Sequence, residues 1–382
     1  MLFVTETFLL FFLVVYVVYW ALPAGWRLAW LLGASLFFYA SWSFLFTLHF
    51  LGVIGINYVV MEIWKIKRSK LLFIALQIGN VANIAVFKYY YFLADFLGVV
   101  TGIGAWRHPH LITEHRDLGT EIFLPLAISF YTFQIMAYGF DIYRGTYTVN
   151  HRFRDVVLFK SFFPQLIAGP IMRSSELLPQ IANYINSKAA VPDADRTKKG
   201  VWLILIGVVK KLLLGDQLML VIAPVLSTPM DGIPEYSPAA LWFVYYCTFV
   251  FIYLDFSAYS DMARGFGYLL GFEIPINFRA PAFAHSVAEF WRRWHVTFSL
   301  WIRDYIFIPL GGSRVSEGRV YFNYVFAFFL GGLWHGASYA FVIWGTLMGI
   351  ALSIDAFLMK RDSTPSVPRT PCCTSAAWSP AC

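Results

Sequence analysis

The chain has 382 residues, of which 59% are hydrophobic, 19% aromatic and only 13% charged. Soluble domains carry about 25% charged residues, so this composition excludes an ordinary soluble protein and indicates a membrane protein. The net charge of +7 does not indicate nucleic-acid binding, because the basic residues gather in short loops at 65–70, 144–154 and 195–199. Such loops fix the cytoplasmic side of a polytopic protein, and we expect all three in the cytoplasm.

Apolar runs recur along the whole chain. A membrane-spanning helix needs about 20 mostly apolar residues, and only helices satisfy their own backbone groups in lipid. Such runs occupy residues 7–22, 28–48, 50–64, 71–87, 122–140, 201–222, 239–259, 320–333 and 337–359. We therefore predict an all-α, polytopic transmembrane bundle with about nine to eleven spans. The first run should remain an uncleaved helix, because Glu6 and not a basic cluster precedes it.

Three stretches depart from this pattern. Residues 101–120 form a polar loop with three histidines, and we expect no metal site there because no carboxylate or thiolate framework accompanies them. Two prolines break the apolar stretch 162–173, which favours a re-entrant segment lining an internal cavity over a straight helix. Residues 361–382 are rich in proline and cysteine and should be disordered, which leaves 1–360 as the membrane domain.

The segment 288–312, AEFWRRWHVTFSLWIRDYIFIPLGG, combines aromatic and basic residues. On a continuous helix its aromatic residues fall on one arc and Arg292, Ser299 and Arg303 on another, with His295 at the border. Such a helix suits the membrane interface. Two roles stay open: a basic anchor without chemistry, or an anion site whose arginines hold the phosphates of a donor such as a coenzyme A thioester.

Two acidic residues, Asp255 and Asp261, lie in the otherwise apolar segment 251–267. An acid at the bilayer centre costs about 2.5–3.5 kcal/mol on insertion scales, so it is rarely idle. Arg264 follows Asp261 at helical spacing, and we expect these two to form a structural ion pair. For Asp255 a structural pair and a place in a functional site both stay open.

His335 lies in LGGLWHGASY and is the only His, Asp, Glu, Lys or Arg between Arg319 and Asp355. The apolar stretch 320–359 around it is too long for one span, and its glycines mark where a helix can break or approach another closely. A desolvated imidazole stays neutral near pH 7 and can accept a proton, as a general base must. A structural histidine satisfied by a neighbour is the alternative, but a membrane interior favours function.

Five motifs follow one another along the chain: LPLAISFYTFQ (124–134), FFPQLIAGPIMR (162–173), DFSAYSDMARG (255–265), FWRRWHVTFSLWIRDYIFIPLGG (290–312) and LGGLWHGASYAFVIWG (330–345). Together they resemble the alginate O-acetyltransferase branch of the membrane-bound O-acyltransferase superfamily. The resemblance extends over residues 1–360, and its last two motifs are the most specific.

The resemblance implies a helical bundle in which funnels from both membrane faces meet at a histidine. The catalytic histidine of the family's WHG motif corresponds to His335, and the histidine of its RRWH motif corresponds to His295. His335 would take the proton from an acceptor hydroxyl or poise the acyl carrier, and His295 would orient it or the acyl carbonyl. The acyl group would come from a cytoplasmic donor and leave outward, toward a cell-envelope polysaccharide.

We therefore predict a membrane-bound O-acyltransferase, multi-pass in the bacterial cytoplasmic (inner) membrane, that acetylates an exported, alginate-like polysaccharide. Arg292, Arg293 and Arg303 would favour an anionic donor, and Ser299 and Asp255 are further candidates for binding donor or substrate. We expect no bound cofactor and no metal, with acetyl-CoA or another acyl carrier as co-substrate. The expected partners are membrane lipid, the polysaccharide acceptor and a periplasmic or cell-surface acetyltransferase. Family members usually continue beyond the WHG segment, so we expect this chain to lack C-terminal helices.

Three alternatives stay open. D-alanyl transfer to teichoic acid, by a related branch of the superfamily, differs in the donor that it requires. In a transporter or channel, the Asp and His residues within the membrane would form a proton or ion path, and flux would not depend on an acyl donor. A membrane scaffold without catalysis would transfer no label from a radioactive acyl donor.

Overall fold

The structure is a computed structural model that describes residues 3–102, 125–146, 151–186, 192–228 and 236–361. Every regular element in this described part is helical, which confirms the predicted all-α class. The three histidines of the predicted polar loop and the predicted disordered tail beyond residue 361 lie outside the described residues. The chain divides into two compact units: Met1–Leu51 with Asn150–Phe278, and Gly52–Val149 with Arg279–Cys382.

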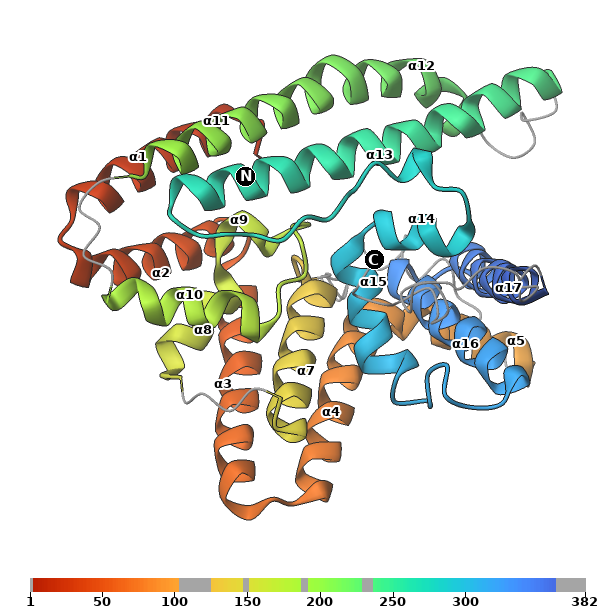
Figure 1. Ribbon diagram of the computed structural model, residues 1–382, viewed down its shortest axis with the longest axis horizontal. Helices are drawn as coiled ribbons and strands as arrows, with labels where there is room; N and C mark the ends of the chain where they lie inside the picture. Colours follow the sequence, from red (N-terminus) through yellow and green to blue (C-terminus); the bar gives the residue numbers. More distant parts are fainter. Residues whose placement is uncertain (1–2, 103–124, 147–150, 187–191, 229–235, 362–382) are drawn as a thin grey trace, which may run out of the picture. The chain divides into compact units, whose positions relative to one another are not determined.

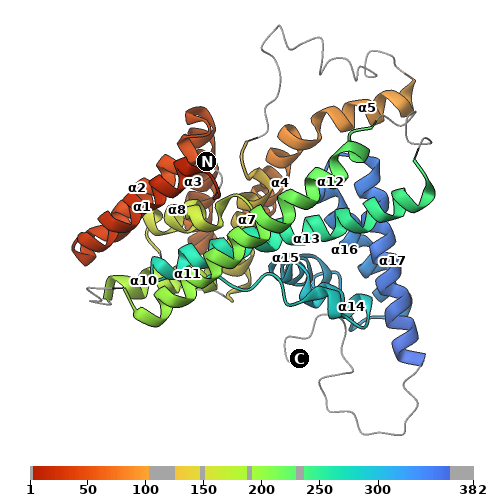
Figure 2. The same cartoon turned by 90° about the horizontal axis from the view of Figure 1, so that it is seen from above.

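The first unit contains helices from the N-terminal region and from the middle of the chain. They are α1 (Glu6–Ala21), α2 (Ala24–Ala40), the first turns of α3 (Phe44–Lys67), α8 (Phe153–Ser161), α9 (Phe163–Leu166), α10 (Ser174–Asn186), α11 (Ala194–Val208), the π-helix η4 (Val209–Gly215), α12 (Asp216–Leu226) and α13 (Pro238–Leu269). α13 lies alongside the run of α11, η4 and α12 in both views (Figure 1, Figure 2). A Cβ atom added at Gly200 of α11 would lie 2.9 Å from the carbonyl oxygen of Gly265 in α13. These glycines let the two helix backbones touch.

Side-chain caps define where several of these helices begin. The hydroxyl of Thr5 accepts the backbone N–H of Phe8 at 3.3 Å at the start of α1. The hydroxyl of Ser237 accepts the backbone N–H of Ala240 at 3.3 Å at the start of α13, whose first residue is Pro238. The first turn of a helix leaves such N–H groups unpaired, and proline is tolerated there because it has no N–H to satisfy.

One predicted boundary is wrong. The apolar pattern indicates runs over 28–48 and 50–64, whereas α3 already begins at Phe44. The hydroxyl of Ser43 accepts the backbone N–H of Phe46 at 3.4 Å, so a polar cap starts this helix inside the apolar run. Hydropathy averaged over a window does not register a single capping residue.

The stretch 162–173 is not a straight helix, as its two prolines predict. Only Phe163–Leu166 is helical there, as the short α9, and all four of its residues are buried. Pro164 occupies the first turn, where its missing N–H costs nothing. That this segment re-enters the membrane or lines a cavity stays a prediction.

The second unit contains the remaining turns of α3 and the C-terminal helices. Its other helices are α4 (Lys70–Ile84), the π-helix η1 (Ala85–Tyr89), α5 (Tyr90–Thr101), α7 (Ile128–Arg144), the 3-10 helix η6 (Pro281–Phe283), α14 (Val287–Arg293), α15 (Val296–Ile302), the π-helix η7 (Arg303–Phe307), α16 (Glu317–His335) and α17 (Tyr339–Arg361). Buried Asn57 of α3 and Asn80 of α4 exchange two amide hydrogen bonds of 2.8 and 2.9 Å. This exchange satisfies both amides and joins the two helices.

The predicted division of the stretch 320–359 into two helices is confirmed. α16 ends at His335, α17 begins at Tyr339, and the two helices pack against each other. A Cβ atom added at Gly345 of α17 would lie 2.9 Å from the Cα atom of Gly332 in α16. The glycines therefore permit the close helix approach that the sequence predicts.

Four helical stretches in the described part of the chain are long and apolar enough to cross a membrane: Phe44–Lys67, Lys70–Tyr89, Pro238–Leu269 and Tyr339–Arg361. Together with the low charge content, they support an integral membrane protein. The total number of spans, about nine to eleven from the sequence, stays a prediction.

Candidate active site around His295 and His335

The continuous helix predicted over 288–312 is wrong, because the chain breaks at His295. α14 ends at Arg293 and α15 begins at Val296. Between them His295 has φ 43° and ψ 54°, in the left-handed region. A residue other than glycine seldom adopts this conformation, and holding it costs about 1–3 kcal/mol. Such strain persists where the surrounding structure enforces it, often at a functional site.

A variant of the capping box, in which the glutamate reaches the residue before the N-cap, holds the short helix before this break. The hydroxyl of Ser286 accepts the backbone N–H of Glu289 at 3.1 Å, and the Glu289 carboxylate accepts the backbone N–H of His285 at 2.8 Å. The second carboxylate oxygen accepts from the guanidinium of Arg293 at 2.5 Å. The His285 N–H and the Arg293 guanidinium together lower the pKa of the Glu289 carboxyl.

The break turns His295 into the interior of the second unit. Its side chain is 2% exposed, and its ring lies 5.1 Å from the ring of Phe298 and 6.0 Å from that of Trp334. On the predicted continuous helix it would have stood at the border between the aromatic and basic arcs. The left-handed backbone instead directs the imidazole among aromatic rings.

His335 is the last residue of α16 and remains exposed. Its ring lies 4.7 Å from Trp334, 5.1 Å from Trp344, 5.9 Å from Phe341 and 6.1 Å from Phe298. The ring is exposed because the helix stops at His335 and no following turn covers it, while four aromatic rings surround its inner side.

The structure brings the two predicted histidines to one aromatic pair. Phe298 of α15 and Trp334 of α16 stack with ring centroids 4.3 Å apart, and each of them contacts both histidine rings. The RRWH and WHG motifs, far apart in sequence, therefore meet in the second unit. One histidine is accessible to a reactant, and the other is buried behind the same rings.

The predicted donor-binding residues of this unit lie on the elements around the break. Arg292 is half-buried on α14 beside Arg293. Arg303, the first residue of η7, pairs with the neighbouring Asp304 at 2.6 Å. Ser299 is buried and its hydroxyl donates to the carbonyl of Trp294 at 3.3 Å, so it supports the turn before α15.

Asp255 lies in the other unit, on α13. Its carboxylate is 2.7 Å from the ammonium group of Lys211, which is also 2.7 Å from Asp216. Within its own unit this acid pairs with a lysine of η4. The sequence left open a structural ion pair or a place in a functional site for Asp255, and these contacts support the ion pair.

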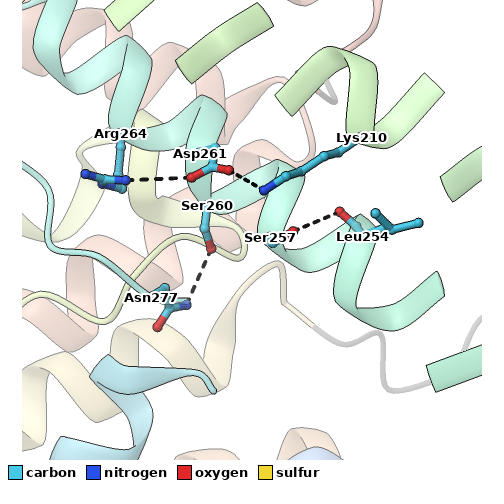
Figure 3. A network of polar contacts seen from close by, with 7 residues as sticks. All are labelled: Lys210, Leu254, Ser257, Ser260, Asp261, Arg264 and Asn277. Atoms are coloured by element: carbon cyan, nitrogen blue, oxygen red, sulfur yellow. Dashed lines mark hydrogen bonds and ion pairs between the residues drawn. The ribbon is translucent and has the colours of Figure 1, made fainter. Parts of the chain in front are cut away.

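The predicted pair of Asp261 and Arg264 is confirmed, and the structure adds a lysine to it. Asp261 lies 3.7 Å from Arg264 and 2.7 Å from Lys210, and Figure 3 shows its carboxylate between the two cations. The sequence interpretation missed Lys210 and Lys211. Two adjacent lysines within the apolar run 201–222 were the available signal.

The sequence interpretation also missed Lys88 and Tyr89 of η1. The ammonium group of Lys88 donates to the carbonyl of Trp334, and the hydroxyl of Tyr89 donates to the carbonyl of Leu333. Both acceptors lie in the last turn of α16, directly before His335. A lysine immediately after the apolar run 71–87 was the signal in the sequence.

The helical membrane fold is that of an integral membrane protein, and the paired histidines form its candidate active site. A model of the membrane-bound O-acyltransferase family matches residues 151–379. The chain belongs to this family. The matched region contains both histidines and the ion pairs of α13.

Curated relatives resemble most of the chain. It is 35% identical to a peptidoglycan O-acetyltransferase of Helicobacter pylori over 85% of its own length and 63% of the relative's. It is also 35% identical to a probable alginate O-acetylase of Azotobacter vinelandii, over 97% of its own length and 71% of the relative's. A teichoic acid D-alanyltransferase of Streptococcus thermophilus is 27% identical over 72% of this chain and 66% of the relative. The chain spans about two thirds of the length of these relatives.

Proposed function

We propose that this protein is a membrane-bound O-acetyltransferase that moves acetyl groups from a cytoplasmic donor across the bacterial inner membrane to an exported polysaccharide. The observation that carries the proposal is the meeting of His295 and His335 at the stacked rings of Phe298 and Trp334. The relatives named for O-acetyl transfer to polysaccharides are 35% identical, against 27% for the D-alanyltransferase. This difference favours acetyl over D-alanyl as the acyl group, and an alginate-like polymer is the acceptor of this proposal.

The accessible imidazole of His335 suits the general base. It takes the proton from the acceptor hydroxyl while the hydroxyl oxygen attacks the acetyl carbonyl carbon. The new carbon–oxygen bond forms, the thioester carbon–sulfur bond breaks, and the proton passes from the imidazole to the departing thiolate. A base of this kind contributes about 10²–10⁴ in rate. His295 is too deeply buried to meet the hydroxyl directly, so its role is to orient His335 or the acyl carbonyl.

The arginines around the break suit an anionic donor such as acetyl-CoA or another acyl carrier. Arg293 and Arg303 each hold a neighbouring carboxylate, so their charges are partly neutralised. Arg292 is the arginine we assign first to the donor phosphates, with the other two adding to the local positive potential. The polysaccharide, membrane lipid and a periplasmic or cell-surface acetyltransferase are the partners of this proposal, and no bound cofactor or metal takes part in it.

Replacing the proposed base tests the function. His335→Gln keeps a hydrogen-bonding side chain but cannot take a proton, so acetylation of envelope polysaccharide should fall by about 100-fold or more. His285→Gln is the matched control, because His285 is exposed and lies outside both histidine motifs. Cells making equal amounts of each protein are compared by mass analysis of the polymer. Undiminished acetylation by His335→Gln would remove this histidine from the mechanism.

The same cells separate the rival functions. D-alanyl esters in place of acetyl esters would assign the chain to the teichoic acid branch. Ion or proton flux in vesicles without any acyl donor would favour a transporter or channel. A polymer that carries no added acyl group in cells with the unmodified protein would reject the proposed reaction.

A further inference from the structure

The last turn of α16 carries His335, and its backbone depends on groups outside the helix. The final four carbonyl groups of any helix have no partner within it. Gly336 follows with φ −174° and ψ 157°, so the chain leaves the helix at once in an extended conformation. The carbonyls of Leu333 and Trp334 belong to this final turn. In a membrane helix such carbonyls must find donors from neighbouring elements.

Both donors come from the π-helix η1. Lys88 donates its ammonium protons to the carbonyl of Trp334, and Tyr89 donates its hydroxyl proton to the carbonyl of Leu333. The Lys88 ammonium also lies 3.5 Å from the hydroxyl of Ser129 at the start of α7. Two consecutive side chains thus hold two consecutive carbonyls. Lys88 also links α16 to α7 through Ser129.

The local backbone of η1 makes this arrangement possible. A π-helix is wider than an α-helix, is rare, and occurs mostly as a short insertion within α-helices, frequently at functional sites. Here it occupies Ala85–Tyr89 between α4 and α5, and its last two residues are the two donors. Both are partly buried, and the ring of Trp334 lies 6.0 Å from the Lys88 ammonium.

A lysine is an unusual donor at the end of an apolar helix such as Lys70–Tyr89. Charged side chains are rare in membrane segments, and a neutral amide could donate without a charge to desolvate. A cation is nevertheless well matched to the end of α16, because the C-terminus of a helix carries partial negative charge. The charge therefore strengthens the hold on the turn beyond what a neutral donor would provide.

We propose that Lys88 and Tyr89 are positioning residues for acyl transfer: by holding the carbonyls of Leu333 and Trp334 they fix the final turn of α16 and the direction of the His335 imidazole. The inference rests on the proposed role of His335 as base. Neither residue touches the reacting atoms. They prevent the turn from fraying, since an error of about 1 Å in the position of a catalytic group can cost 100-fold in rate.

Three substitutions test the inference in membrane vesicles supplied with radiolabelled acetyl-CoA and envelope polysaccharide. Lys88→Met removes the ammonium group, Tyr89→Phe removes the hydroxyl, and Lys88→Arg keeps a cationic donor. Lys360→Met is the matched control, because Lys360 of α17 pairs with Glu317 at the opposite end of α16. It repeats the same chemical change at another lysine that contacts α16, away from the histidine.

We expect Lys88→Met to lower kcat by about 10- to 100-fold with KM for acetyl-CoA unchanged, and Lys88→Arg to recover most of the loss. Tyr89→Phe should lower kcat by a smaller factor, and Lys360→Met should leave it unchanged. His335 should also react several-fold faster with a histidine-modifying reagent in Lys88→Met, measured by mass spectrometry of the labelled peptide. This second readout does not require an active enzyme.

Four outcomes would overturn the inference: an unchanged kcat in Lys88→Met, a change in KM alone, an equal loss in Lys360→Met, or an unchanged rate of His335 modification. If Lys88→Met does not accumulate, Tyr89→Phe decides by the same measurements. Rejection of the proposed function gives a different result from rejection of the positioning role, because the His335→Gln variant would then acetylate the polymer normally. Active His335→Gln therefore rejects the base, whereas inactive His335→Gln with fully active Lys88→Met rejects only the positioning role.

Discussion

Replacement of Gly345 by alanine should separate α16 from α17 and disturb the candidate site. A Cβ atom there would lie 2.9 Å from the Cα atom and 3.0 Å from the amide nitrogen of Gly332, and closer still to the carbonyl oxygen of Phe328. All three neighbours are backbone atoms, so no side chain can rotate to make room. The helices must move apart instead, and Gly332 lies in the same last turns of α16 as His335.

The expected change in the free energy of unfolding of Gly345→Ala follows from two opposing contributions. Overpacking of a well-packed interior costs about 1–3 kcal/mol, whereas alanine gains about 1 kcal/mol over glycine in helix propensity. Gly79→Ala in α4 isolates the second term, because nothing lies within 4 Å of a Cβ atom at that position. The free energies of unfolding of the two variants should therefore differ by about 1–3 kcal/mol, with Gly345→Ala the less stable.

Thermal unfolding in detergent measures this difference, and polymer acetylation in cells measures its effect on the site. Gly345→Ala should unfold several degrees below Gly79→Ala and acetylate less polymer at equal protein amounts. Coincident unfolding midpoints and equal acetylation would refute the close approach of the two helices at Gly332 and Gly345.

Three further predictions follow from the ion pairs, the strained histidine and the basic loops. Lys210→Met should lower the free energy of unfolding by about 1–3 kcal/mol, because Asp261 loses a partner at 2.7 Å and both side chains are largely shielded. The double variant with Asp261→Asn should lose less than the two single changes added together, and a double-mutant cycle by thermal unfolding checks this. The His295→Asn variant should be more stable than the His295→Val variant by about 1 kcal/mol or more, because asparagine tolerates the left-handed backbone and a β-branched residue does not. Equal thermal unfolding midpoints of the two variants would contradict the enforced φ of 43°. Cysteines introduced singly into 65–70 and 195–199, in a background without the four native cysteines, should react with an impermeant reagent only after the cells are opened.

Local composition and periodicity determined much of the architecture. The low charge and repeated apolar runs predicted an all-helical membrane protein, because a chain in lipid must satisfy its backbone within helices. The prolines of 162–173 predicted the interrupted helix there, and the glycines of 330–345 predicted the close approach of α16 and α17. The pair of Asp261 and Arg264 was also predictable, since residues three apart share a helix face. Each of these features depends on neighbours within a few turns.

Only the tertiary structure decided which distant groups meet. The break at His295 followed no helix-breaking residue, because packing around a buried ring enforces its left-handed backbone against local preference. The partners of Lys88 and Lys210 lie 246 and 51 residues away, and no periodicity relates positions so far apart. The same holds for the two histidines: the sequence indicated each one separately, whereas the fold placed both beside Phe298 and Trp334 and left His335 alone exposed. Long-range packing joins segments that share no local pattern, so the structure was needed to assemble the site.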